Sequence, residues 1–249
     1  MLRFKDKVVL VTGGTTGIGY AIAERIAREG GEVFICSSQQ SNVDEAIKKF
    51  KEMGLNISGT TCNISKSQDR KKVLEIIEQK HGRLDVLVLN AGISNYAGKN
   101  LLINEEAYDE LFNVNVKSQF FFIKEAYPLL KKSPKDANIL VNSSIMGKSP
   151  DKFIGVYAMT KATLISMIKS LAQELIPDNI RINGIGPGFV ETHMTEPIKM
   201  LQKSRKQELN PKIYGQPSQI ASIVATMCSE DGSFVNGETY FMQGVLGKI

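Results

Sequence analysis

Three side chains near the middle of the chain have the types and the spacing for proton transfer. Tyr157 and Lys161 lie four residues apart in the run Y-A-M-T-K, and Ser144 stands thirteen residues before the tyrosine. On a helix, positions i and i+4 share one face about 6 Å apart. The ammonium of Lys161 would then favour the phenolate and lower the pKa of Tyr157 from its ordinary value of about 10. The spacing predicts a group that exchanges a proton with an alcohol or a carbonyl without a metal.

Such a pair needs a scaffold, and short β-rich runs alternate with longer amphipathic segments along the chain. The predicted strands are Lys7–Val11, Glu32–Ser37, Asn56–Cys62, Leu84–Leu89, Asn138–Asn142, Ile180–Ile185 and Thr239–Met242. The predicted helices are Ile18–Glu29, Val43–Met53, Ser67–Lys80, Glu105–Lys131, Val156–Leu175 and Pro217–Ser229. Strands that are apolar at every position, such as V-L-V-L at 86–89, are typical of a parallel sheet with helices on both faces. The alternation therefore predicts an α/β fold with a doubly wound parallel sheet, whose ligands bind beyond the carboxyl ends of the strands.

Two small-residue turns follow predicted strands. The first strand ends in Thr12-Gly13-Gly14-Thr15-Thr16-Gly17-Ile18-Gly19, and a helix begins at once. Glycines allow close approach of the backbone to a pyrophosphate, and the helix start offers free N–H groups and a positive dipole end. The second turn, Asn90-Ala91-Gly92, follows the fourth predicted strand and indicates either a further ligand contact or a simple strand-to-loop turn.

The composition indicates one globular domain over residues 1–249. The chain is 42% hydrophobic and 23% charged, and its net charge of +5 is spread over a lysine-rich surface. The densest basic stretch, Lys199–Lys212, alternates with neutral and acidic residues, which argues against a nucleic-acid surface. The segment at about 190–215 fits neither the helix nor the strand period. It is expected to be a lid over the ligand cleft or an ordinary surface excursion.

The cysteines and the chain ends bear on the cellular compartment. Cys36, Cys62 and Cys228 are too few and too scattered for a disulfide framework or a zinc site. No apolar run approaches the roughly 20 residues that span a bilayer, and the N-terminus lacks an apolar signal region. The final Gly247-Lys248-Ile249 does not match the S-K-L peroxisomal address. These features predict a reduced, cytoplasmic protein without a membrane partner.

The motifs T-G-x-x-x-G-x-G, N-A-G, a strand-end serine and Y-x-x-x-K occur in this order, so the chain resembles the short-chain dehydrogenase/reductase family. The resemblance covers the whole length and extends to Pro187-Gly188, Thr192 and Gly237-Glu238-Thr239. It implies a Rossmann-type sheet of seven parallel strands. Four stretches are also similar to the NADPH-dependent carbonyl and retinol reductases of this family, namely Cys36-Ser37-Ser38, Asn42-Val43-Asp44, Asn115-Val116-Lys117 and Cys228-Ser229-Glu230-Asp231.

The resemblance implies a catalytic tetrad of Asn115, Ser144, Tyr157 and Lys161. Tyr157 would be the general acid or base, and Ser144 would donate a hydrogen bond to the substrate oxygen. Lys161 would bind the nicotinamide ribose, and Asn115 would hold a water in the proton path. Ser143 and Asn113 are the alternatives for the serine and the asparagine. The family's cofactor would contact Gly13, Thr15, Thr16, Gly17, Ile18, Gly19, Ser37, Ser38, Asn63, Ile64, Asn90, Ala91, Gly92, Tyr157, Lys161, Pro187, Gly188, Val190 and Thr192.

The end of the second predicted strand bears on which nicotinamide cofactor is used. An acidic residue there would bind the adenosine ribose and repel a 2′-phosphate. This chain has Ser37 and Ser38 instead, which favours NADP(H), with NAD(H) as the alternative because no arginine follows the two serines. Asn63 replaces an aspartate that the family usually has, and its carbonyl oxygen is expected to accept from the adenine amino group.

The expected function is therefore an NADP(H)-dependent oxidoreductase that acts on a small carbonyl or secondary alcohol. A 3-oxoacyl carrier-protein reductase is the alternative enzyme, because a basic patch could dock an acidic carrier. That patch would consist of Lys199, Lys203, Arg205 and Lys206. A dinucleotide sensor without catalysis is the alternative from another class. Family analogy implies a homotetramer or a homodimer.

Overall fold

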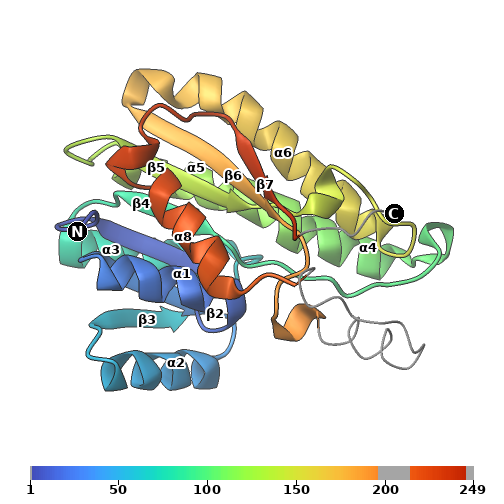
Figure 1. Cartoon of the computed structure of the whole chain (residues 1–249), viewed down its shortest axis with the longest axis horizontal. Helices are drawn as coiled ribbons and strands as arrows, with labels where there is room; N and C mark the ends of the chain where they lie inside the picture. Colours follow the sequence, from blue (N-terminus) through green and yellow to red (C-terminus); the bar gives the residue numbers. More distant parts are fainter. Residues whose placement is uncertain (1, 196–213, 245–249) are drawn as a thin grey trace.

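A seven-stranded parallel sheet forms the centre of the molecule (Figure 1). The computed structural model describes residues 2–195 and 214–244. The strand order is β3-β2-β1-β4-β5-β6-β7, and every neighbouring pair is parallel. The strands are β1 Val8–Thr12, β2 Glu32–Ser37, β3 Ile57–Thr61, β4 Val86–Leu89, β5 Ala137–Asn142, β6 Ile180–Pro187 and β7 Thr239–Met242. The order reverses between β1 and β4, and this arrangement confirms the predicted fold class.

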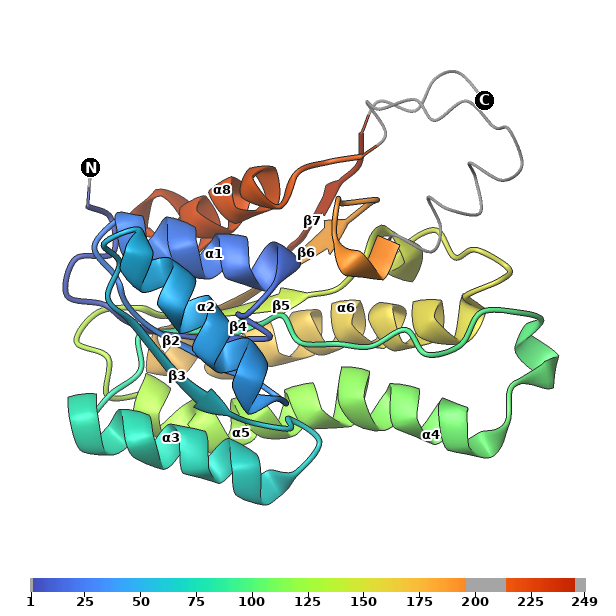
Figure 2. The ribbon, with the colours of Figure 1, turned by 90° about the horizontal axis from the view of Figure 1, so that it is seen from below.

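Helices cover both faces of the sheet (Figure 2). Their bounds are α1 Gly17–Arg28, α2 Gln40–Glu52, α3 Ser67–His81, α4 Glu105–Phe112, α5 Ser118–Leu130, α6 Gly155–Leu175 and α8 Pro217–Met227. One hydrophobic cluster joins the sheet to α1, α2 and α8, and a second joins its other face to α3, α5 and α6. The described helices include none that is both long enough and apolar enough to cross a membrane.

The alternation of side chains along β1 explains why this strand is apolar throughout. Val9 and Val11 belong to the cluster under α1 and α8, whereas Val8 and Leu10 belong to the cluster on the opposite face. All four residues are buried because successive side chains of a strand point to opposite faces. Burial on both faces fixes the strand in the middle of the sheet, so its carboxyl end lies at the point where the strand order reverses.

One predicted helix differs in the structure. The expected segment Glu105–Lys131 is interrupted by a π-helical turn at Asn113–Lys117, which separates α4 from α5. A π turn inserts one extra residue into the helical repeat and shifts the face that a side chain occupies. The expected lid segment lies mostly outside the described residues, although Val190 pairs with Gly215 and His193–Thr195 form a 3-10 turn. The proposed carrier patch also lies outside them.

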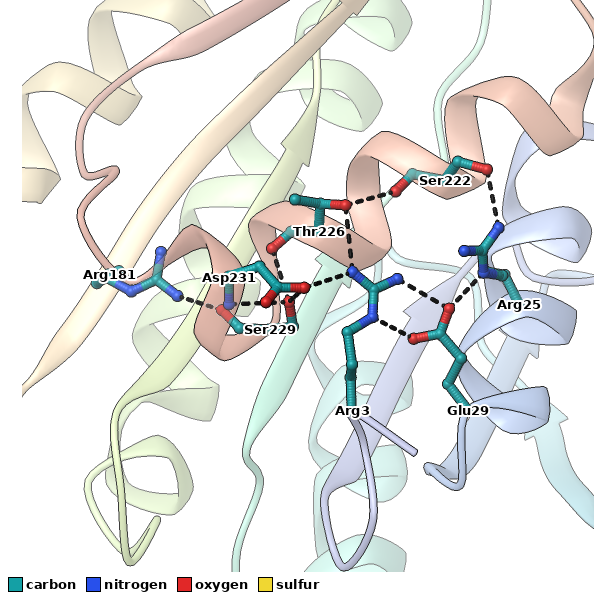
Figure 3. A network of polar contacts seen from close by, with 8 residues as sticks. All are labelled: Arg3, Arg25, Glu29, Arg181, Ser222, Thr226, Ser229 and Asp231. Atoms are coloured by element: carbon teal, nitrogen blue, oxygen red, sulfur yellow. Dashed lines mark hydrogen bonds and ion pairs between the residues drawn. The ribbon is translucent and has the colours of Figure 1, made fainter. Parts of the chain in front are cut away.

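An arginine-rich polar network joins α1 to α8 and the turn that follows it (Figure 3). Arg3 donates to both carboxylate oxygens of Glu29, at 2.6 and 2.8 Å, and pairs with Asp231 at 2.8 Å. Buried Arg181 donates to backbone carbonyls of the segment after α8, including Gly232 at 2.7 Å and Val235 at 2.9 Å. These bonds hold the last helix and the seventh strand against the rest of the sheet.

Candidate active site

A cleft of about 550 Å³ lies at the carboxyl ends of the strands, where the order of the sheet reverses. Its walls come from the turns after β1, β2, β3, β4 and β5, from α6 and from the segment after β6. Predicted residues that line the cleft are Gly13, Thr15, Thr16, Gly17, Ile18, Ser37, Ser38, Asn63, Ile64, Asn90, Ala91, Gly92, Ser144, Tyr157, Lys161, Pro187, Gly188, Val190 and Thr192. The lining does not include Gly19 and Asn115, which lie behind it.

The turn between β1 and α1 can hold a phosphate. Gly13 and Gly17 have φ angles of +62° and +55°, which favour glycine. A Cβ at Gly19 would lie 2.2 Å from the Gly13 carbonyl oxygen, so only glycine fits at this crossing. Thr16 precedes α1 without a side-chain cap, which leaves the N–H groups of the first turn available to an anion. This end of the cleft suits a dinucleotide pyrophosphate.

Ser144 and Tyr157 meet at the opposite end of the cleft. The Ser144 hydroxyl accepts a hydrogen bond from the Met146 N–H at 3.1 Å and lies near enough to the Tyr157 hydroxyl to lower its pKa. Ser143 faces elsewhere, because its hydroxyl donates to the Lys161 backbone carbonyl at 2.8 Å. The geometry therefore pairs Ser144, rather than its neighbour, with the tyrosine.

Lys161 is buried beside this pair, with 4% of its surface exposed. Its Nζ donates to the Asn142 backbone carbonyl at 2.8 Å and lies 5.5 Å from the centre of the Tyr157 ring. Removal from water lowers the pKa of Lys161 from 10.5 to about 8, because burial penalises the ammonium.

The expectation that Lys161 lowers the pKa of Tyr157 is wrong for this structure. Desolvation raises the pKa of Tyr157 to about 12, and the nearby Ser144 hydroxyl offsets only part of that rise. The ammonium is directed at the Asn142 carbonyl, so it does not contact the phenolic oxygen through a hydrogen bond. Desolvation outweighs attraction here, and Tyr157 keeps its proton at neutral pH.

The π turn places Asn115 behind the cleft, with 1% of its surface exposed. Its Oδ1 accepts from the Ile93 N–H at 2.8 Å, and its Nδ2 donates to the Ile93 carbonyl at 2.9 Å and to Thr160 Oγ1 at 3.2 Å. The side chain therefore anchors the backbone immediately after Gly92 and links it to α6. A role for Asn115 in holding a water stays a prediction.

The adenosine end of the cleft carries neutral polar groups after β2 and β3. Ser37, Ser38 and Asn42 line the wall after β2, with no carboxylate among them. The expected acceptor at Asn63 is already engaged, since its Oδ1 accepts from the Ser65 N–H at 3.1 Å and the Ser65 hydroxyl at 2.7 Å. Both acceptor positions of that carbonyl oxygen are thereby used within the turn, which corrects the expected contact to adenine.

Several lining residues escaped sequence reasoning as site residues. They are Asn42, Cys62, Ser65, Ile93, Glu110, Val114, Asn142, Met194 and Thr195, and the alternatives Asn113 and Ser143 also line the cleft, as does His193. Most of them adjoin a motif residue, so proximity to N-A-G, to the serine or to Thr192 was the available signal. Glu110 had no such signal, because it reaches the cleft from α4, away from the predicted motifs.

Comparison with known proteins places this cleft in a family. The family described as "short chain dehydrogenase" matches residues 7–203. The chain belongs to the short-chain dehydrogenase/reductase family. Human "Dehydrogenase/reductase SDR family member 4" is 36% identical over 242 residues, which cover 96% of this chain and 87% of that protein. "Tropinone reductase-like 3" of Erythroxylum coca is 35% identical, with 97% and 93% of the two chains covered.

Solved structures of short-chain dehydrogenases/reductases share the fold. L-sorbose reductase from Gluconobacter frateurii, complexed with NADPH and L-sorbose, superposes with a TM-score of 0.87 at 27% identity, covering 97% of this chain and 96% of that one. A short chain dehydrogenase from Burkholderia cenocepacia in complex with NADP gives a TM-score of 0.86 at 28% identity, with 97% and 98% covered. As a short-chain dehydrogenase/reductase, the chain is an oxidoreductase.

Proposed function

We propose that this oxidoreductase uses NADPH to reduce the carbonyl group of a small molecule to an alcohol, with Tyr157 as the proton donor. The observation that carries the proposal is the placement of the Tyr157 hydroxyl beside Ser144 and Lys161, in the same cleft as the glycine turn. A pKa of about 12 keeps the phenol protonated at neutral pH, which suits the donation of a proton to a forming alkoxide.

Each neighbouring side chain has a distinct part in this proposal. Ser144 donates a hydrogen bond to the substrate oxygen where negative charge develops. Lys161 supplies a positive charge beside Tyr157, and Asn115 holds the backbone at Ile93 in place. The nicotinamide supplies the hydride to the carbonyl carbon when the dinucleotide is bound. The same groups run in reverse for alcohol oxidation, with Tyr157 as the base.

The proposed preference for NADP(H) rests on the wall after β2. Ser37 and Ser38 bring hydroxyls and no carboxylate to this position, so nothing there repels a 2′-phosphate. Two solved relatives with NADPH or NADP bound support the same choice. The glycine turn fits the pyrophosphate, because a Cβ at Gly19 would collide with the Gly13 carbonyl. The alternative cofactor is NAD(H). Activity measured with NADPH and with NADH would distinguish the two.

The test is consumption of NADPH and NADH with a panel of dicarbonyls, retinoids, steroids and acyl thioesters. Tyr157→Phe should reduce turnover by at least a hundredfold while NADPH still binds, because the ring remains and only the proton donor is lost. Tyr127→Phe is the matched control, since that hydroxyl bonds Asp178 between α5 and the end of α6, away from the cleft. Substantial turnover by the Tyr157 variant would reject the proton-donor role.

A further inference from the structure

Thr160 lies on α6 between Tyr157 and Lys161, and none of its surface is exposed. Its hydroxyl donates a hydrogen bond to the Tyr157 backbone carbonyl at 2.7 Å. The lining of the cleft includes Tyr157 and Lys161 but not Thr160, so the threonine lies behind the wall that carries the proposed proton donor. Any part that Thr160 has in the reaction must therefore act through its neighbours.

The bond to the Tyr157 carbonyl fixes the direction of a second bond that Thr160 makes. A carbonyl oxygen can only accept, so the Thr160 hydroxyl must be the donor to it. Thr160 Oγ1 is then an acceptor for Asn115, whose Nδ2 donates to it at 3.2 Å. The same Nδ2 donates to the Ile93 carbonyl at 2.9 Å, and Asn115 Oδ1 accepts from the Ile93 N–H at 2.8 Å. The Asn115 amide thus has one orientation, and both of its N–H groups are engaged.

One line of hydrogen bonds therefore joins two walls of the cleft. It runs from the Tyr157 backbone through Thr160 and Asn115 to Ile93. Tyr157 belongs to α6, whereas Ile93 lines the cleft after β4, directly beyond the N-A-G turn. The two walls also approach each other at Gly92, where a Cβ would lie 3.1 Å from Asn115 Oδ1 and 3.5 Å from Lys161 Nζ. Thr160 is the residue that ties α6 to this wall.

The hydroxyl bond within the helix is not by itself a sign of function. Threonines in helices commonly donate to a carbonyl three or four residues earlier, and Thr163 on the same helix donates to the Met159 carbonyl at 2.9 Å. Thr163 is exposed, so that bond serves only the helix. Thr160 differs because it also accepts from Asn115. Loss of its hydroxyl would leave a buried amide N–H without this partner, which costs free energy unless the amide moves.

We propose that Thr160 is a positioning residue, which acts through Asn115 to set the placement of Tyr157 relative to the cleft wall at Ile93. The proposal rests on the proposed function, because it takes Tyr157 as the proton donor. A carbonyl that receives a hydride and a proton needs both donors close to it, and a small displacement of either slows the reaction. The glycine turn and the wall after β2 are not part of this line of bonds, so the affinity for NADPH should change little.

The experiment measures the single-turnover rate of NADPH oxidation with the best carbonyl substrate of the panel, and the dissociation constant of NADPH by calorimetry. Thr160→Val replaces the hydroxyl with a methyl group of similar size. This variant should lower the rate by a factor of about five or more, while the dissociation constant stays within about twofold of the wild-type value. Thr160→Ser keeps the hydroxyl and should restore the rate to within about twofold of the wild type.

Thr163→Val is the matched control, because it removes the same kind of helical hydroxyl bond without touching Asn115, and its rate should equal that of the wild type. Asn115→Ala tests the route: in that background Thr160→Val should lower the rate by less than about twofold, because the bond to the amide is already absent. Thr160→Ala gives the same readout should the valine variant not fold.

Three outcomes would overturn the proposal. They are an unchanged rate in the Val or Ala variant of Thr160, an equal loss in the Ser variant, and an equal effect of Thr160→Val with and without the Asn115 side chain. A wild type that oxidises NADPH with none of the carbonyl substrates would instead refute the proposed function.

Discussion

Lys161→Met should make the free protein more stable at neutral pH while it removes the positive charge beside Tyr157. The ammonium is buried, and its pKa falls from 10.5 to about 8. At about 1.4 kcal/mol per pH unit, this difference corresponds to a cost of about 3 kcal/mol when the charged lysine folds into place. Methionine fills a similar volume without that cost, but it forfeits the hydrogen bond to the Asn142 carbonyl, worth about 1 kcal/mol. The net gain at pH 7 is about 2 kcal/mol.

The pH dependence has a definite sign. Below pH 8 the lysine is protonated in both the folded and the unfolded chain, so the full cost is present. Between about pH 8 and 10.5 the unfolded chain holds more protons than the folded one, and the stability of the wild type rises with pH. The methionine variant lacks this rise. Its advantage should therefore shrink above pH 8 and disappear near pH 10.

The assay is urea and thermal unfolding of both proteins at pH 7, 8, 9 and 10. For a domain of this size, about 2 kcal/mol corresponds to a rise in Tm of roughly 4–8 °C. Lys169→Met on the same helix is the control, because Lys169 is exposed and its loss should change stability by less than about 0.5 kcal/mol. A methionine variant that is less stable at pH 7, or a stability difference that does not vary with pH, would refute the reasoning.

Three further changes test other parts of the structure. Ser37→Asp should shift the ratio of kcat/KM for NADPH and NADH at least tenfold toward NADH, because a carboxylate repels the 2′-phosphate. An unchanged ratio would contradict the proposal that the residue at the end of β2 sets the cofactor preference. Gly19→Ala places a methyl group 2.2 Å from the Gly13 carbonyl oxygen and should weaken NADPH binding at least tenfold by calorimetry. Glu29→Gln should cost about 1–3 kcal/mol at pH 7 in urea unfolding, because Arg3 hydrogen-bonds the Glu29 carboxylate and lowers its pKa. That stabilisation is present above the ordinary pKa of 4.5 and is lost as pH falls through the lowered one, so wild type and variant should converge once the pH is below that lowered pKa.

The sequence predicted those features that depend on local patterns. The apolar run 86–89 and the spacing of Gly13, Gly17 and Gly19 each carry their meaning within a few residues, so the sheet and the phosphate turn were predictable. Asn142 was not, because its partner Asn90 lies 52 residues away in the chain and only the pairing of β4 with β5 brings them together. The family motif points to the serine at this strand end, so only the neighbours Ser143 and Ser144 were considered as site residues.

The pKa shifts of the site residues could not be predicted from the spacing of those residues in the sequence. Four residues along a helix place Tyr157 and Lys161 on one face, as predicted. The direction of the pKa change depends instead on how much water reaches the two groups and on where the ammonium points. The Asn142 carbonyl of β5 accepts the hydrogen bond of Lys161 Nζ, and the surrounding chain buries the lysine and desolvates the phenol. Only the assembled tertiary structure contains that information.

The extra residue in the π turn at Asn113–Lys117 has a consequence for chain length. A single deletion there would convert the π turn to ordinary α-helix and leave the flanking helices in nearly their present phase. Phe122 and Ala126 of α5 would keep packing on the sheet, but Asn115 would lose its hydrogen bonds to the Ile93 backbone. Natural homologues and engineered variants should therefore tolerate gaps in the exposed connection at 134–135 far more readily than in this five-residue stretch.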